Sequence, residues 1–280
     1  MTSVARIVNR LRQAANEGSL GATVRAGISN RAAGLNRRCR DVYFRAGYAV
    51  ACYVYDRGLR HAASMNRYPI PLPELGIERG NPVTAGKGAT SWEKWRLIEA
   101  NLPAGSKTAM DIGSNNGFFA IRLAQAGLFT LGVEPDIELL RLAQAAAIRA
   151  DVRGVAFSSL PVSPENVSQL PPADVTVVMS VAHRWIRAHG RDIGDAMVKT
   201  IWEKTHRAMF FESPSAAQST KERDILHYFG STDGEAELNI IGWLNSLGGG
   251  KARLLGFLPS DFRPAEKRHL FVLERRGSPE

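Results

Sequence analysis

The sequence predicts an α/β protein with an open, mostly parallel β-sheet that ends in an antiparallel hairpin, preceded by an N-terminal helical extension. Three observations lead to this fold class. A buried strand, a glycine turn and a helix start follow one another over residues 107–126. Strand and helix patterns then alternate as far as residue 211, which is typical of parallel strands joined by crossover helices. The last two strand patterns, 252–258 and 269–274, are separated by about ten residues, too few for a crossover helix.

The first 68 residues carry the basic charge of the chain. They hold twelve arginines, no lysine and three acidic residues, so their net charge is 12 − 3 = +9, equal to that of the whole chain. Apolar residues at helical spacing predict a basic amphipathic helix near residues 4–11, and a second helical stretch at about 36–65 carries arginines ahead of aromatic side chains. We therefore interpret residues 1–68 as a basic helical arm.

Three interpretations of this arm stay open. It can form a lid or a homo-oligomer contact that packs its aromatic face and leaves its arginines in solvent. It can instead lie on an anionic membrane surface. Arginines interleaved with aromatic residues can also bind the phosphates of RNA. An arginine-rich, acid-poor N-terminus is typical of a mitochondrial presequence as well.

A proline-rich connector separates the arm from the rest of the chain. Prolines 69, 71 and 73 fix their own backbone angles and favour an extended segment, so residues 69–90 are assigned as a linker. Ser91 is suited to cap a helix that contains Trp92 and Trp95. The main domain is therefore expected at residues 91–280.

The glycine turn after the first strand predicts a ligand site. The strand 108–112 leads to Gly113, and Gly117 allows a helix to start against the strand without a clash. The third glycine of the dinucleotide fingerprint is missing. Asp111 at the end of the strand would repel a pyrophosphate, but it can pair with the ammonium group of an amino acid.

The second strand adds a nucleoside-binding feature. It spans about residues 129–136 and includes Glu134, whose carboxylate can accept both hydroxyl groups of a ribose. A ligand with an amino-acid end and a nucleoside end is S-adenosylmethionine. Any doubly wound α/β protein can carry a glycine turn after its first strand, so the turn alone does not identify the ligand.

From Trp92 to Arg275 the sequence resembles the class I S-adenosylmethionine-dependent methyltransferases, whose first motif is acid-x-Gly-x-x-x-Gly and whose second strand ends in an acid. The resemblance implies a Rossmann-like methyltransferase sheet with the reversed final hairpin. Many members place an acid after the third strand to bind adenine, where this chain has serines. The expected cofactor-binding residues are Asp111, Gly113, Ser114, Asn115, Asn116, Gly117, Glu134, Ser158 and Ser180.

The remaining elements follow in strand and helix order. Apart from the final hairpin, their expected ranges are a helix at 137–150, a strand at 152–157, a short helix or loop at 164–170, a strand at 173–179, a helix at 190–205 and a strand at 207–211. Residues 213–250 resemble an insertion, with helices near 220–229 and 235–247. We expect this segment to cap the acceptor side of the site.

Candidate catalytic residues follow the fourth and fifth strands. His183 is expected to face the cleft as a base for an acceptor hydroxyl, and Glu212 is the second candidate. If the acceptor is a phosphate, Arg184 and Arg187 can clamp its oxygens. The alternative for His183 is a satisfied histidine in an ordinary strand–helix loop. The expected acceptor-binding residues are Arg184, Trp185, Arg187 and His189.

The same stretch resembles the methyltransferase part of bacterial enzymes that terminate O-antigen polysaccharides. The shared pattern is matched by Ser180, Val181, His183, His189 and Gly190. This resemblance implies O-methylation of a saccharide, polysaccharide or glycolipid-type acceptor, or of a phosphate-bearing one. An RNA methyltransferase and a non-catalytic nucleotide-binding protein with the same fold are the alternatives.

Composition sets the remaining limits. With 44% hydrophobic and 22% charged residues, the chain is typical of soluble globular proteins, and its apolar runs are too short to span a bilayer. Cys39 and Cys52 lack metal-ligand spacing and favour a reducing compartment. We expect a cytoplasmic protein, with peripheral binding to the inner face of the membrane as an option, and we expect no catalytic metal.

Overall fold

The structure is a computed structural model that describes residues 74, 89–213, 230, 232–259 and 267–276. The predicted arm, most of the linker and the helix expected near 220–229 lie outside these residues. Within the described parts of the chain, no helix is long and apolar enough to cross a membrane.

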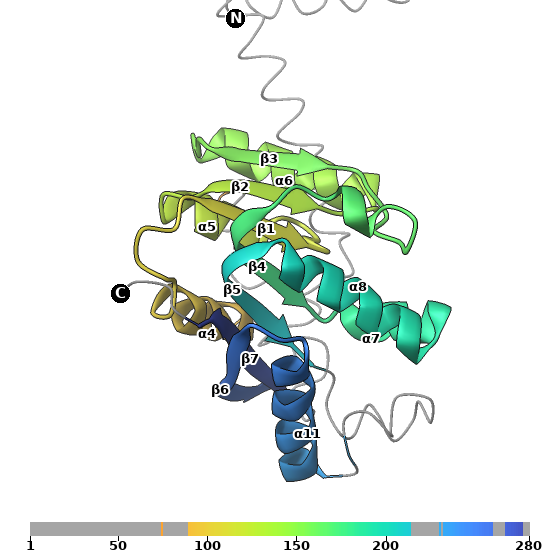
Figure 1. Cartoon of the computed structure of the whole chain (residues 1–280). Coiled ribbons are helices and arrows are strands. Elements are labelled where there is room, and N and C mark those ends of the chain that lie inside the picture. Colours follow the sequence, from red (N-terminus) through yellow and green to blue (C-terminus); the bar gives the residue numbers. More distant parts are fainter. Residues whose placement is uncertain (1–73, 75–88, 214–229, 231, 260–266, 277–280) are drawn as a thin grey trace, which may run out of the picture. The chain divides into compact units, whose positions relative to one another are not determined.

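Seven strands form one sheet in the order β3-β2-β1-β4-β5-β7-β6, which Figure 1 shows from top to bottom. Their bounds are β1 Thr108–Ile112, β2 Phe129–Val133, β3 Val155–Ser158, β4 Ala173–Met179, β5 Thr205–Glu212, β6 Gly250–Pro259 and β7 Lys267–Arg275. The first five strands pair in parallel, and β7 runs antiparallel to both β5 and β6. The predicted mostly parallel sheet with an antiparallel final hairpin is therefore confirmed.

Helices pack on both faces of the sheet. Their bounds are α4 Ala89–Glu99, α5 Phe118–Gln125, α6 Ile137–Arg149, the 3₁₀ turn η3 Val167–Gln169, α7 Ala182–His189, α8 Arg191–Glu203 and α11 Asp233–Ser246. Successive side chains of a strand point to opposite faces, so each central strand contributes to two cores. In β5, Ala208 and Phe210 pack with α4 and α5, while Met209 and Phe211 pack with α8 and α11.

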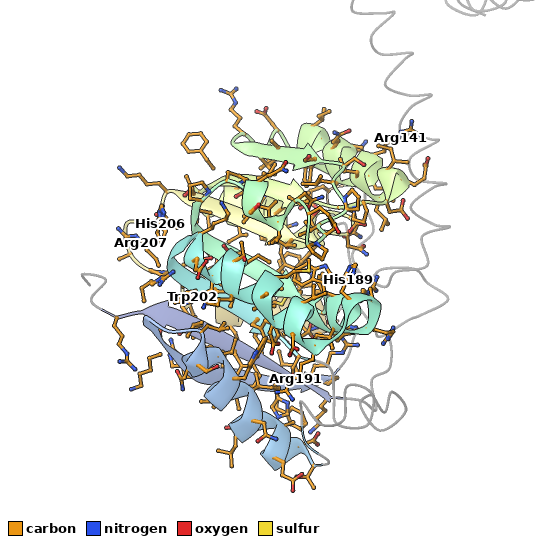
Figure 2. The ribbon with its side chains drawn as sticks, turned by 45° about the vertical axis from the view of Figure 1, so that its right-hand side comes forward. Arg141, His189, Arg191, Trp202, His206 and Arg207 are labelled. Atoms are coloured by element: carbon orange, nitrogen blue, oxygen red, sulfur yellow. The ribbon has the colours of Figure 1, made fainter. Side chains whose placement is uncertain are left out.

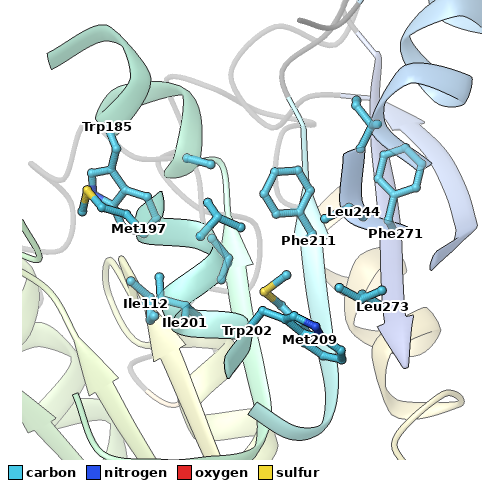
Figure 3. Close-up of a cluster of buried hydrophobic side chains, with 14 of the residues drawn as sticks. Ile112, Trp185, Met197, Ile201, Trp202, Met209, Phe211, Leu244, Phe271 and Leu273 are labelled. Atoms are coloured by element: carbon cyan, nitrogen blue, oxygen red, sulfur yellow. The ribbon is translucent and has the colours of Figure 1, made fainter. Parts of the chain in front are cut away.

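The larger core fixes α8 and the final hairpin against the parallel strands. Figure 3 shows Trp202 of α8 beside Met209 of β5, and Ile201 of α8 beside Ile112 of β1. The indole nitrogen of Trp202 donates to the carbonyl of Gly248 over 2.6 Å. A fully buried tryptophan with its N–H satisfied contributes a large apolar area without a desolvation penalty. The antiparallel end of the sheet is thereby joined to the parallel part.

Helix α7 is the main difference from the expected elements, because no helix or strand was expected between residues 179 and 190, where it lies. Ala182, Trp185 and Ile186 are buried and fall at helical spacing, so they form an apolar face over the sheet. Eight residues are too few for a clear periodic signal in sequence. Strand β3 also begins at Val155 rather than at residue 152, since Gly154 has a left-handed φ of 78° just before it.

Candidate active site

A cavity of about 250 Å³ lies at the carboxyl ends of β1, β2, β4 and β5. Its walls come from the glycine turn, the end of β2, residues 160–162 after β3, the β4–α7 connection, the end of β5, α4 and the start of β7. In open α/β sheets, ligands bind in the crevice outside the carboxyl ends of the strands. The sequence-predicted residues that line the cavity are Gly113, Ser114, Asn115, Glu134, Ser180, Arg184, Trp185 and Glu212.

The glycine turn needs glycine at both ends. Gly113 has a φ of 73°, and a Cβ there would lie 2.5 Å from Cγ2 of Val181. Gly117 has a φ of 82°, and its Cβ would lie 2.6 Å from Cβ of Ala143. Both positions therefore combine a left-handed backbone with a close approach of α7 or α6. The turn brings its backbone to the cavity wall with no intervening side chain at Gly113.

Glu134 is oriented by two backbone amides. Its Oε2 accepts from the amide of Asn115 over 2.9 Å, and its Oε1 accepts from the amide of Asp136 over 3.0 Å. The side chain is buried but lines the cavity. A carboxylate has about four lone-pair positions, so two acceptor positions remain for the hydroxyls of a diol. This arrangement fits the ribose of a nucleoside.

Asp111 corrects one expectation. Its carboxylate is 1% exposed, it is absent from the cavity wall, and its Oδ2 accepts from the amide of Ala120 over 3.0 Å. Asp111 thus holds the first turn of α5 and does not line the cavity. Burial, and to a lesser extent the charge of Glu134, raise its pKa to about 7 although the Ala120 amide opposes the shift.

Three other predicted cofactor residues also lie outside the cavity wall. Asn116 and Gly117, at the end of the turn, do not line the cavity, and Ser158 contributes its carbonyl, which accepts from the amide of Glu134 over 3.1 Å. The wall next to Glu134 is instead apolar, formed by Leu160 to Val162. An adenine ring can pack against such a surface, so the serine expected to replace the adenine-binding acid is not needed for that contact.

The opposite wall contains a buried charged network centred on Glu212. Lys94 Nζ lies 2.9 Å from Glu212 Oε1, and Ser180 Oγ donates to Glu212 Oε2 over 2.8 Å. Arg268 donates from Nη1 to Ser180 Oγ. Burial raises the pKa of Glu212, but the charges of Lys94 and Arg268 together with its hydrogen bonds hold it below the ordinary value. The carboxylate is therefore ionised at neutral pH.

Lys94 and Arg268 are the site residues that sequence reasoning missed. Both line the cavity, although one comes from α4 and the other from β7. The sequence does contain a feature that could have identified Lys94. It shares a helical face with the buried Ser91, Trp95 and Ile98, where a lysine without a partner is rare. Arg268 follows residues outside the described range, and its position depends on the register of the final hairpin.

His183 also differs from expectation. Its side chain is 5% exposed, is absent from the cavity wall and has no hydrogen-bond partner for Nδ1 among the described residues. Burial lowers its pKa to about 3, and the charges of Arg268, Arg184 and Arg187 act in the same direction. A buried imidazole with so low a pKa is neutral at pH 7 and is a weak base. His183 is therefore placed as a packed residue on the inner face of α7.

The predicted acceptor-binding residues lie in α7, and only some of them line the cavity. Arg184 and Trp185 line the cavity. Arg187 and His189 are exposed and do not line it. Figure 2 labels His189 at the end of α7 and Arg191 at the start of α8, on either side of Gly190. His206 and Arg207 lie at the other end of the molecule in the same view, beside the start of β5. Within the described parts of the chain, no group of three or more His, Cys, Asp or Glu side chains can hold a metal ion.

The strand order with its reversed β7 defines the fold of the described domain. The described domain has the Rossmann-like fold of the class I S-adenosylmethionine-dependent methyltransferases. No protein-family model matches the sequence, and no curated protein is significantly similar to it.

Two of the solved structures that are similar to this domain illustrate the fold. The crystal structure of WbdD, a bifunctional kinase-methyltransferase, aligns with a TM-score of 0.56 and 16% identity over 77% of this chain and 46% of its own. The present chain thus matches less than half the length of WbdD. The N-terminal domain of EvdMO1, crystallised with S-adenosylhomocysteine, aligns with a TM-score of 0.53 and 15% identity over 79% of this chain and 96% of its own.

Proposed function

We propose that this chain is an S-adenosylmethionine-dependent methyltransferase that methylates a hydroxyl oxygen of a saccharide, polysaccharide or glycolipid-type acceptor. The observation that carries the proposal is the arrangement of Glu134, held by the amides of Asn115 and Asp136 at the wall of a cavity that also contains the glycine turn. EvdMO1, which shares the fold, binds S-adenosylhomocysteine. When bound, the cofactor supplies a methyl group on a positively charged sulfur.

The residues present fit this cofactor. Glu134 would accept the ribose hydroxyls, the backbone of Gly113 to Asn115 would face the methionine part, and Leu160 to Val162 would pack on the adenine. The approach of Val181 to Gly113 closes the floor of the cavity between these parts. Each contact comes from a group that is already oriented by hydrogen bonds or packing, so little side-chain entropy is lost on binding.

Glu212 replaces His183 as the residue proposed to receive the hydroxyl proton. Its ionised carboxylate lines the cavity, whereas His183 does not. A carboxylate with a low pKa can serve, because the acceptor oxygen becomes positively charged as the new C–O bond forms and its proton becomes strongly acidic. The likeness to WbdD, a kinase-methyltransferase, concerns the fold alone. The saccharide acceptor is proposed from the resemblance of the stretch Ser180 to Gly190 to enzymes that terminate O-antigen polysaccharides.

The experiment is a transfer assay with S-adenosylmethionine labelled in the methyl group. The full chain is incubated with neutral sugars, phosphorylated sugars, a bacterial glycolipid and a transfer RNA pool, and the product is located by mass spectrometry. Label on a sugar hydroxyl is the expected result. Label on RNA or on a phosphate oxygen would refute the hydroxyl acceptor, and the absence of transfer to any of these acceptors would leave the proposal without support.

A further inference from the structure

Lys94 occupies a position in α4 where a lysine needs a specific reason. Its neighbours Trp95 and Ile98 are buried in the core, and the side chain of Lys94 is itself only 4% exposed. A buried ammonium group is strongly unfavourable unless a counter-charge lies close to it. The carboxylate of Glu212, also 4% exposed, supplies that charge at 2.9 Å. The pair connects the helix before β1 with the end of β5.

Each oxygen of Glu212 has its own partner. The Lys94 ammonium forms an ion pair with Oε1 at 2.9 Å, while the Ser180 hydroxyl donates to Oε2 and accepts from Arg268. Ser180 has a φ of 55°, a left-handed conformation that non-glycine residues rarely adopt. Such a backbone persists only where its surroundings fix it, and here the hydroxyl lies between a carboxylate and a guanidinium group. The plane of the Glu212 carboxylate is therefore set from both sides.

The network faces the space where an acceptor would lie. Lys94, Ser180, Glu212 and Arg268 all line the cavity, on the wall opposite Glu134. The Ser180 hydroxyl takes one of about four lone-pair positions on the carboxylate, and the Lys94 ammonium lies against Oε1 as an ion pair, so an acceptor hydroxyl can still donate to the carboxylate. In the transfer the hydroxyl oxygen forms the new C–O bond, the electron pair of the broken bond leaves with sulfur, and the hydroxyl proton goes to Glu212.

We infer that Lys94 and Arg268 are positioning residues that keep Glu212 ionised and turned toward the acceptor hydroxyl. The inference rests on the proposed function for the identity of that hydroxyl. Without Lys94, the burial of Glu212 would favour the protonated acid, which can donate a hydrogen bond to the acceptor but cannot receive its proton. The helix α4 and the strand β7, which are far apart in sequence, thus complete the site.

The test follows the titration of Glu212 by ¹³C NMR of carboxyl-labelled glutamate, with Glu212→Gln to assign the signal. In the wild-type chain Glu212 should titrate below the ordinary value for glutamate. In Lys94→Met its midpoint should rise by at least about one pH unit, and in Lys94→Arg it should stay low. Lys199→Met, which removes an exposed lysine of α8, is the matched control and should leave the midpoint unchanged.

Arg268→Gln provides a second folded variant if Lys94→Met does not fold, and it should show a smaller rise. A wild-type midpoint above the ordinary glutamate value, or equal midpoints in the wild type and the folded variant, overturns the inference. Calorimetry with S-adenosylmethionine on the same samples separates the two claims. A wild-type chain that fails to bind this cofactor refutes the proposed function, whatever the titration shows.

Once an acceptor is known, kinetics give an independent readout. Lys94→Met should lower kcat by about 10²-fold or more, the lower range for a positioned general base, while its affinity for S-adenosylmethionine stays unchanged. The acidic limb of its pH–rate profile should move to higher pH. A variant with normal kcat and an unmoved profile contradicts the positioning role.

Discussion

Asp111 is a buried carboxyl group that holds a helix amide and lies near a second acid, Glu134. Its pKa is about 7 in the folded chain and 3.8 when unperturbed, so between these values the folded state binds more protons than the unfolded state. The contribution of Asp111 to the free energy of unfolding should therefore fall as the pH rises from about 4 to 7, by about 4 kcal/mol if the whole shift is expressed.

Asp111→Asn tests this directly. Asparagine keeps an oxygen that can accept from the Ala120 amide, but it does not ionise. Urea unfolding at pH 5 and pH 8 should show that the variant gains stability relative to the wild type at the higher pH. A difference between the two proteins that does not change with pH would contradict the raised pKa.

The pH dependence of stability that His183 contributes is opposite to that of Asp111. Its pKa falls from 6.5 to about 3 on folding, so the folded state binds fewer protons between these values. Its contribution to stability is complete above pH 6.5 and is lost as the pH falls toward 3. His183→Gln should therefore reduce the loss of stability between pH 6.5 and 4, measured by urea unfolding. Equal acid sensitivity in the two proteins would show that the imidazole is not buried in its neutral form.

At the scale of elements, the connection from β1 to α5 depends on its glycines. Gly113→Ala places a Cβ 2.5 Å from Val181 in a left-handed backbone, so we expect a loss of about 1–3 kcal/mol in the free energy of unfolding. Gly242→Ala is the control, since this helical glycine of α11 has open space around it and should gain about 0.5–1 kcal/mol. Chemical denaturation of both variants gives the comparison, and equal effects at the two positions would contradict the account of the turn.

The bounds of elements that depend on local sequence patterns could be predicted from the sequence. The expected ranges of β1 and β4 agree with the structure residue for residue, because each is a short apolar run between turn residues. Glu134 could be proposed as a ribose ligand because it ends the strand next to the glycine turn. Lys94 could not be linked to Glu212, since their contact depends on how α4 packs over the sheet. His183 was placed wrongly because the helix α7, which turns it inward, was not foreseen.

At the scale of the whole molecule, the described cavity is built by residues between Lys94 and Arg268. The basic arm of residues 1–68 remains a prediction from sequence. We expect a chain that lacks these residues to bind S-adenosylmethionine with unchanged affinity and to lose salt-sensitive association with anionic liposomes or RNA. Loss of cofactor binding in the shortened chain would favour a lid or an oligomer contact instead.

The most direct test of the account is the affinity of the full chain for S-adenosylmethionine, measured by calorimetry in the wild type and in two variants. Glu134→Ala removes the proposed ribose ligand, and Glu138→Ala removes an exposed carboxylate four residues further on. We expect the wild type to bind, Glu134→Ala to lose about 1.5–3 kcal/mol of binding free energy, and Glu138→Ala to match the wild type. No binding to the wild type at millimolar cofactor, or equal affinities for the folded Glu134→Ala and the wild type, would contradict the central claim.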